Sequence, residues 1–139
     1  MMAGKLWLVI AGFMGALAVA FGAFQSHGLE SYLEPMNLKP EDVQERMRIF
    51  DLGVRYQIYN TLALAVVGAI RLRYASGMSF LSGVALLVGT LLFSGTLYYY
   101  ATSGDKTFNT VAAFGGSTQI VGWLLFAFSA LMLQPREEA

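Results

Sequence analysis

Three long stretches without a charged side chain restrict most strongly how this chain folds. They cover residues 6–26, 79–100 and 107–134, with 21, 22 and 28 residues. A helix of about 20 apolar residues is long enough to cross the roughly 30 Å hydrocarbon layer of a bilayer. Only 13% of the 139 residues are charged, which is about half the share typical of soluble domains. The sequence therefore predicts a helical protein that lies mostly in a membrane.

A fourth uncharged run, residues 56–70, is bounded by Arg55 and Arg71 and is too short to cross a bilayer alone. An apolar stripe at helical spacing leads into it, formed by Val43, Met47, Phe50, Val54 and Ile58. Pro40, Glu41 and Asp42 are typical of a helix start. We expect an amphipathic helix over about 41–53 at the membrane surface, which turns into or continues as a span.

These segments predict one all-α domain over residues 1–139, an integral membrane four-helix bundle with an additional amphipathic helix in its first loop. The approximate spans are 6–26, 54–72, 79–101 and 111–133. An alternative for the first span is a cleavable signal peptide, because Ala18-Val19-Ala20 fits an A-x-A site. Its apolar run is longer than the 7–15 residues of a signal peptide, so we favour a span.

Small residues recur every fourth position in the first span, at Gly12, Ala16 and Ala20. Such faces allow two membrane helices to approach closely, and they are most simply read as ordinary packing surfaces.

Composition excludes several classes of function. The nine basic and nine acidic residues balance, which argues against a nucleic-acid partner. The absence of cysteine removes thiolate chemistry, and a single histidine leaves the usual zinc and haem sites without enough ligands. His27 and Glu30 form an H-x-x-E pair, but a metal site needs further ligands. We assign no catalytic residue, no metal and no cofactor.

Five polar residues form a candidate cluster between the first two spans, if those spans are antiparallel neighbours. They are His27, Glu30, Arg55, Gln57 and Asn60. Polar groups at membrane depth usually face the bundle and find partners there. One interpretation is a hydrogen-bonded network that pins the two helices, and we favour it. The alternative is a binding site in which Arg55 meets an anionic headgroup or small molecule.

Four segments together resemble a known family. They are GAFQSHGL from Gly22, RYQIYNTLAL from Arg55, LFSGTLY from Leu92, and Phe114-Gly115-Gly116 followed by Gly122-Trp123. In this order they are similar to a widespread family of small membrane proteins of unknown function, which includes bacterial proteins and the eukaryotic transmembrane protein 256. The resemblance implies a multi-pass inner-membrane protein of about four spans with no assigned activity.

The chain departs from the family pattern at several positions. That pattern reads GAFGAHGL in the first segment, whereas this chain has Gln25 and Ser26 in place of the small pair. The family usually has histidine where Asn60 stands and proline where Ala113 stands. A site that needed two histidines could therefore not be carried here.

We expect a multi-pass membrane protein that is not an enzyme. Its role is structural or accessory, through helix packing, self-association or membership of a larger membrane complex. The alternative is a small-molecule or lipid binding or transport module that uses the polar cluster. Membrane lipids are the expected partners, and no nucleic acid is. Arg71 and Arg73 lie in a very short predicted loop, which favours termini in the cytoplasm.

Overall fold

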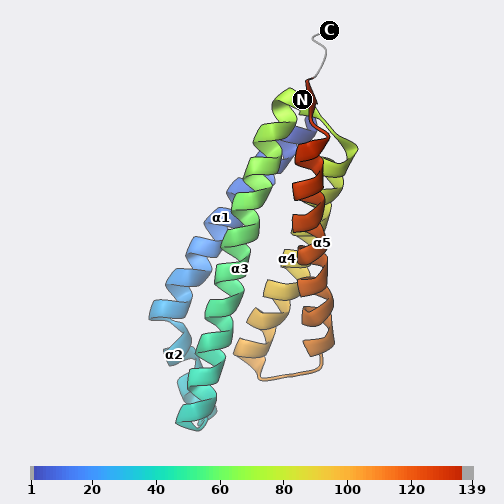
Figure 1. The fold of residues 1–139 in the computed structure, drawn as a ribbon. Coiled ribbons are helices and arrows are strands. Elements are labelled where there is room, and N and C mark those ends of the chain that lie inside the picture. The colour runs from blue at the N-terminus through green and yellow to red at the C-terminus, as the bar shows by residue number, and fades with distance from the viewer. Residues whose placement is uncertain (1, 136–139) are drawn as a thin grey trace.

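Residues 2–135 are described by a computed structural model, and four long helices dominate it (Figure 1). They are α1 (Met2–His27), α3 (Pro40–Arg73), α4 (Gly77–Ser103) and α5 (Asn109–Leu131). A short helix α2 (Leu29–Leu33) and the 3₁₀ turn η1 (Glu34–Met36) connect α1 to α3. The two-residue strands β1 (Tyr74–Ala75) and β2 (Gln134–Pro135) pair antiparallel where the chain begins and ends. The predicted all-helical class is therefore confirmed, apart from this short pair.

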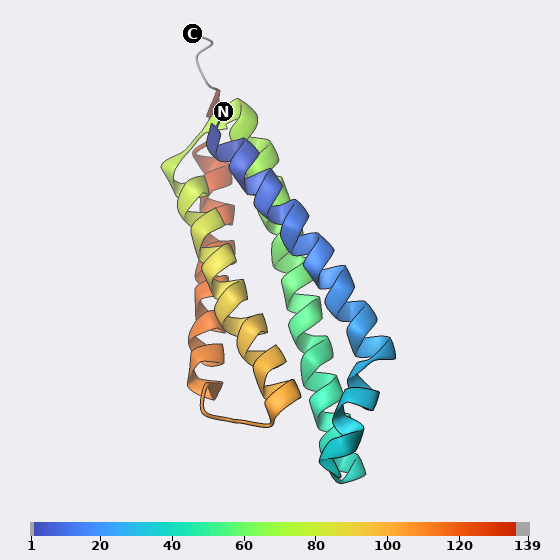
Figure 2. The ribbon, with the colours of Figure 1, turned by 180° about the vertical axis from the view of Figure 1, so that it is seen from behind.

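The long helices pack in sequence order. α1 packs on α3, α3 packs on α4, and α4 packs on α5 (Figure 2). Within residues 2–135, three helices are long and apolar enough to cross a membrane, namely α1, α4 and α5. The helix α3 does not meet that criterion, because its uncharged part is short and its start is polar. We call the end that carries both termini the terminal end and the opposite end, at the α4–α5 connection, the loop end.

The helix α3 is continuous over 34 residues, or about 51 Å. The separate amphipathic helix predicted for residues 41–53 is not confirmed, because this segment is the first part of α3. Gly53 does not interrupt the helix. Its missing side chain leaves room for the Tyr98 ring of α4, since a Cβ atom on Gly53 would lie 2.8 Å from Tyr98 Cε1. At the loop end, the start of α3 extends beyond the α4–α5 connection (Figure 1).

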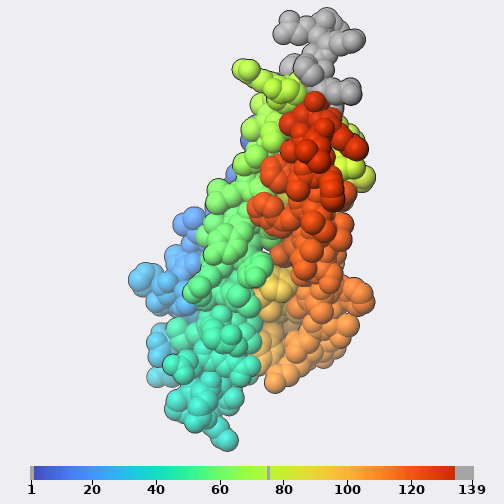
Figure 3. All heavy atoms as spheres, viewed as in Figure 1, coloured from blue at the N-terminus to red at the C-terminus, as the bar shows by residue number. Residues whose placement is uncertain are grey.

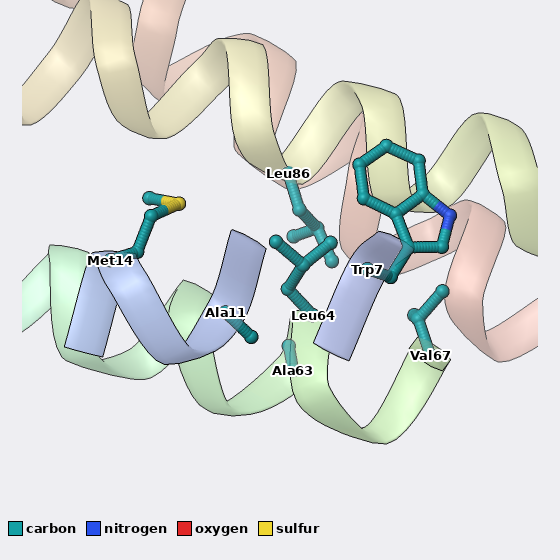
Figure 4. Close-up of a cluster of buried hydrophobic side chains, with 7 residues drawn as sticks. All are labelled: Trp7, Ala11, Met14, Ala63, Leu64, Val67 and Leu86. Carbon is teal, nitrogen blue, oxygen red and sulfur yellow. The ribbon is translucent and has the colours of Figure 1, made fainter. Parts of the chain in front are cut away.

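Two apolar clusters hold the helices together. Towards the terminal end, residues of α1, α3 and α4 interlock, namely Trp7, Ala11, Met14, Ala63, Leu64, Val67 and Leu86 (Figure 4). Towards the loop end, α2 and α3 meet α4 through Leu29, Leu33, Phe50, Val54 and Ala101. Burial of Leu29 and Leu33 explains why α2 folds back onto α3.

Glycines bring α4 and α5 into backbone contact. A Cβ atom on Gly115 would lie 2.5 Å from the backbone nitrogen of Phe93 and 3.0 Å from the carbonyl oxygen of Gly89. Gln119 adds a hydrogen bond, its Nε2 donating to the Gly89 carbonyl at 3.1 Å. Close approach of this kind is how membrane helices associate where lipid removes the usual hydrophobic driving force.

The α4–α5 connection is ordered by Asp105. Its carboxylate accepts hydrogen bonds from the hydroxyl of Thr107 at 2.5 Å and from the Thr107 backbone N–H at 2.8 Å. The hydroxyl of Tyr99 donates to the same carboxylate at 3.0 Å. These bonds, the Thr107 hydroxyl first, hold the pKa of Asp105 below its usual value, because they stabilise the charged form. The connection therefore keeps a fixed shape at neutral pH.

Candidate functional site

Gln57 lies at the centre of the bundle and connects three helices. Gln57 is only 5% exposed. The amide nitrogen donates to the carbonyl of Met14 in α1 at 2.9 Å, and the amide oxygen accepts from the hydroxyl of Tyr98 in α4 at 2.8 Å. Each polar atom of the Gln57 side chain thus has a partner on another helix.

Asn60 makes the equivalent connection to α5. It is 2% exposed, and its amide nitrogen donates to the carbonyl of Tyr56 one turn earlier, at 3.0 Å. Its amide oxygen accepts from the indole N–H of Trp123, also at 3.0 Å. Sequence reasoning missed the pairing of Asn60 with Trp123. The only available signal was an isolated tryptophan in the middle of an apolar run, which names no partner.

The other three residues of the predicted cluster lie at the surface. His27 and Glu30 are exposed, and the side chain of Arg55 is 63% exposed. The Arg55 guanidinium pairs with Asp51 one turn earlier in α3, with 2.5 Å between Nη2 and Oδ2. The structure therefore brings Gln57 and Asn60 into the bundle and does not join them to His27, Glu30 or Arg55. A single five-residue site between α1 and α3 is not formed.

Glu30 lines a surface pocket outside the bundle. This pocket has a volume of about 850 Å³ and lies between the α2–η1 segment and the start of α3. Three carboxylates line it, from Glu30, Glu34 and Glu41, together with apolar side chains such as Met47. Exposed carboxylates of this kind are well solvated, so they identify no ligand by themselves.

An apolar groove lies beside the bond between Asn60 and Trp123. We call it the α3–α5 groove; its volume is about 550 Å³, within the usual range of ligand sites. Its lining residues are Tyr56, Tyr59, Asn60, Leu62, Ala63 and Val66 of α3, with Trp123 and Phe126 of α5. Figure 3 views the face on which α3, in green, and α5, in orange and red, lie side by side, with the end of α4 visible between them in the lower half.

The site offers hydrogen bonds and apolar surface. Gln57, Asn60, Tyr98 and Trp123 satisfy one another and the backbone, so their geometry is fixed by partners on neighbouring helices. A network of satisfied amides within a bundle supplies rigidity and a unique packing arrangement. The groove supplies a concave, largely apolar surface next to it.

These features define a small polytopic helical membrane protein whose helices are fixed by buried amide hydrogen bonds. The chain belongs to the family described as Protein of unknown function (DUF423), whose profile matches residues 21–116. The resemblance to a family of small membrane proteins of unknown function is thereby confirmed.

Bacterial relatives cover almost the whole chain. A UPF0382 membrane protein of Haemophilus influenzae is 32% identical over 124 residues, covering 89% of this chain and 92% of the relative. One from Staphylococcus epidermidis is 29% identical over 133 residues, covering 91% and 96%. One from Staphylococcus haemolyticus is 29% identical over 131 residues, covering 90% and 94%. No solved structure matches the chain. This chain is accordingly a membrane protein of a family without an assigned activity.

Proposed function

We propose that the chain is an inner-membrane protein with four spans, in which α3 is the fourth membrane-crossing helix, and that it is a structural or accessory subunit. The packing of α3 supports its role as a span. Its polar residues at mid-bundle depth, Gln57, Asn60 and Thr61, are all buried against neighbouring helices. The uncharged stretch between Arg55 and Arg71 is about 22 Å long, and the exposed Arg55 side chain can reach towards the headgroups at one end. At the other end the buried Arg71 guanidinium donates to the hydroxyl of Ser79 in α4 at 2.7 Å, so its charge is held within the protein.

The distribution of charge supports cytoplasmic termini. Among the described residues at the terminal end, the charged side chains are those of Lys5, Arg71 and Arg73, all basic. The loop end carries five basic side chains, Lys39, Arg46, Arg48, Arg55 and Lys106, so the number of basic residues alone does not decide the orientation. Because the α3–α4 connection is very short, its arginines weigh strongly in the positive-inside rule. The terminal end therefore faces the cytoplasm in the proposed arrangement.

An unpartnered small-residue face on α1 carries the proposal of an accessory role. Gly12, Ala16 and Ala20 are exposed, whereas Ala11 and Ala18 on the other side of the helix are buried. A Cβ atom on Gly12 would meet no heavy atom within 4 Å. Small residues spaced by four let another helix approach α1 closely. A second copy or a helix of a partner protein fits this face.

Cysteine labelling tests whether α3 crosses the membrane. The chain has no cysteine, so single substitutions report without background. Glu34→Cys precedes α3 and Gly77→Cys follows it. With a membrane-impermeant maleimide, we expect Glu34→Cys to react from the periplasmic side of intact cells and Gly77→Cys to react only after permeabilisation. Lys106→Cys, at the loop end, is the control and should label with Glu34→Cys. Labelling of Glu34→Cys and Gly77→Cys from the same side contradicts a spanning α3.

Substitution on the α1 face tests association. We expect Gly12→Leu to weaken self-association or partner capture by about tenfold, since a bulky side chain separates the helix backbones. Gly95→Leu, at an exposed glycine of α4 whose Cβ atom would likewise meet no heavy atom within 4 Å, is the matched control and should leave association unchanged. Native mass spectrometry and gentle-detergent pulldown measure both. A wild-type protein that is monomeric and brings down no other protein contradicts the proposed role.

A further inference from the structure

The α3–α5 groove runs along one side of α3. Its lining on α3 runs from Tyr56 to Val66, which is about 15 Å along the helix axis. The Tyr56 ring packs on Phe93 of α4, with 5.0 Å between ring centroids, so one aromatic wall is held in place. On α5, Trp123 is fixed by its hydrogen bond to Asn60. An elongated apolar guest can lie between these walls without rearranging them.

The same face of α3 carries two arginines beyond the mouth of the groove. Spacings of 4, 3, 4, 3 and 4 place one set of residues on a single helix stripe, namely Arg48, Leu52, Arg55, Tyr59, Leu62 and Val66. The last three line the groove. Arg48 and Arg55 are both exposed, so their side chains lie at the surface of α3 beyond the apolar part of this stripe.

Contacts between α3 and α4 set the depth of these arginines. The hydroxyl of Tyr100 donates to the carboxylate of Glu45 at 3.2 Å, which places this turn of α3 level with the end of α4. Arg48 therefore lies near the membrane surface, and Arg55 lies seven residues, or about 10 Å, deeper. An arginine at this depth extends its side chain towards the phosphate layer.

Arg48 is the cationic side chain at the mouth that lies outside an ion pair among the described residues, whereas Arg55 is paired with Asp51. Glu45, about one turn before Arg48, accepts the hydrogen bond from Tyr100. With it, the charges of Glu45, Arg48, Asp51 and Arg55 sum to zero, so the mouth offers one guanidinium outside an ion pair rather than a net positive charge. A phosphate can accept hydrogen bonds from both guanidinium groups, which bind phosphate more strongly than neutral donors do.

We propose that the α3–α5 groove binds one phospholipid from the loop-end leaflet, with an acyl chain against Tyr59, Val66 and Trp123 and the phosphate at Arg48 and Arg55. The site requires α3 to cross the membrane, as proposed above, and the cysteine labelling tests that requirement separately. The groove lies between α3 and α5, whereas the association face lies on α1, so each site can be lost without the other.

The two tryptophans allow a direct test. Trp123 lines the groove and is 44% exposed, whereas Trp7 lies in the core and is 3% exposed. Trp7→Phe leaves Trp123 as the single fluorescent reporter. The variant is reconstituted in vesicles that mix brominated phosphatidylglycerol with ordinary phosphatidylcholine, and then in the reverse mixture, because bromine quenches a tryptophan that it contacts. We expect phosphatidylglycerol to bind beside Trp123 about fivefold more tightly than phosphatidylcholine, the effect of one cationic side chain, that of Arg48, outside an ion pair near the surface.

Matched variants separate the parts of the site. The double change Arg48→Gln and Arg55→Gln should bring the ratio of the phosphatidylglycerol affinity to the phosphatidylcholine affinity close to one. Arg73→Gln, at the terminal end, should leave this ratio unchanged. Val66→Phe narrows the groove and should reduce the preference although both arginines are present. Native mass spectrometry of the wild-type protein, counting retained phosphatidylglycerol and phosphatidylcholine, gives the same comparison without the Trp7 substitution.

Three results would overturn the proposal. Equal quenching by both lipids means that Trp123 contacts only the general lipid layer. Absence of quenching by either lipid means that a second copy or another protein covers the groove. Loss of the preference on addition of millimolar inorganic phosphate means that the arginines bind free phosphate, without a lipid chain in the groove. We expect inorganic phosphate to have no such effect.

Discussion

Replacing Gly115 with alanine is expected to destabilise the protein by about 3 kcal/mol, at the upper end of the usual cost of overpacking. The added methyl group would lie 2.5 Å from the backbone nitrogen of Phe93 and 2.9 Å from the backbone carbon of Leu92. These atoms belong to the α4 backbone, so no side-chain rotation can relieve the clash. The two helices must separate, and the hydrogen bond from Gln119 to Gly89 is lost with their contact.

The neighbouring glycine supplies the control for this prediction. A Cβ atom on Gly116 would meet only ring carbons of Phe93, at 3.6 and 3.7 Å, which is ordinary contact. Gly116→Ala should therefore be neutral, or stabilising by up to about 1 kcal/mol through helix propensity. Reversible unfolding in mild detergent measures the free energy of unfolding of both variants. Equal stability of Gly115→Ala and Gly116→Ala would contradict the backbone contact between α4 and α5.

Replacing Gln57 with leucine should cost about 2 kcal/mol, from two interhelical hydrogen bonds of roughly 1 kcal/mol each. The substitution preserves most of the side-chain volume but removes the donor to Met14 and the acceptor for Tyr98. It also leaves the Tyr98 hydroxyl partly buried without its partner, which adds to the cost. The free energy of unfolding in detergent, measured by the same method, gives the loss.

A double-mutant cycle isolates the bond between Gln57 and Tyr98. Gln57→Leu should cost about 1 kcal/mol less in a Tyr98→Phe background than in the wild type, because the bond is already absent there. Tyr99→Phe is the matched control, since Tyr99 is exposed and bonds to Asp105 in the loop. Strict additivity of Gln57→Leu and Tyr98→Phe would show that the bond contributes nothing.

The helical class was predictable from the sequence because its signal is local. Length and hydropathy within residues 6–26, 79–100 and 107–134 suffice to predict membrane-length helices; α1 and α4 cover the first two runs, and α5 lies within the third. The sequence left two alternatives at residues 41–53, a helix that turns into the next span and a helix that continues as that span. Gly53 did not decide between them, because a glycine can end a helix as well as pack within one. Its packing against Tyr98 depends on a residue 45 positions away, which local sequence does not report.

The candidate site was less predictable because it depends on helix rotation. Arg55 and Gln57 are two residues apart, yet about 200° of helix rotation separates their side chains. Arg55 faces outwards and Gln57 faces Met14. The sequence identified Gln57 and Asn60 as polar groups that need partners, but the partner of Asn60, Trp123, lies on a helix whose position relative to α3 leaves no mark in the sequence.

The polar residues at the start of the uncharged part of α3 affect how this helix would insert into the membrane during synthesis. A translocon releases a helix into lipid according to its hydrophobicity, and an arginine costs about 3 kcal/mol at the middle of a segment and less towards its end, where Arg55 lies. With Arg55, Gln57 and Asn60 close together, α3 is a poor substrate for insertion on its own. The helix α1 is synthesised first and offers the Met14 carbonyl to Gln57. The amide oxygen of Asn60 gains its partner, the indole N–H of Trp123, only after α5 has been synthesised. If α3 crosses the membrane as proposed, its polar groups gain their partners from helices made before and after it, and its insertion depends on both.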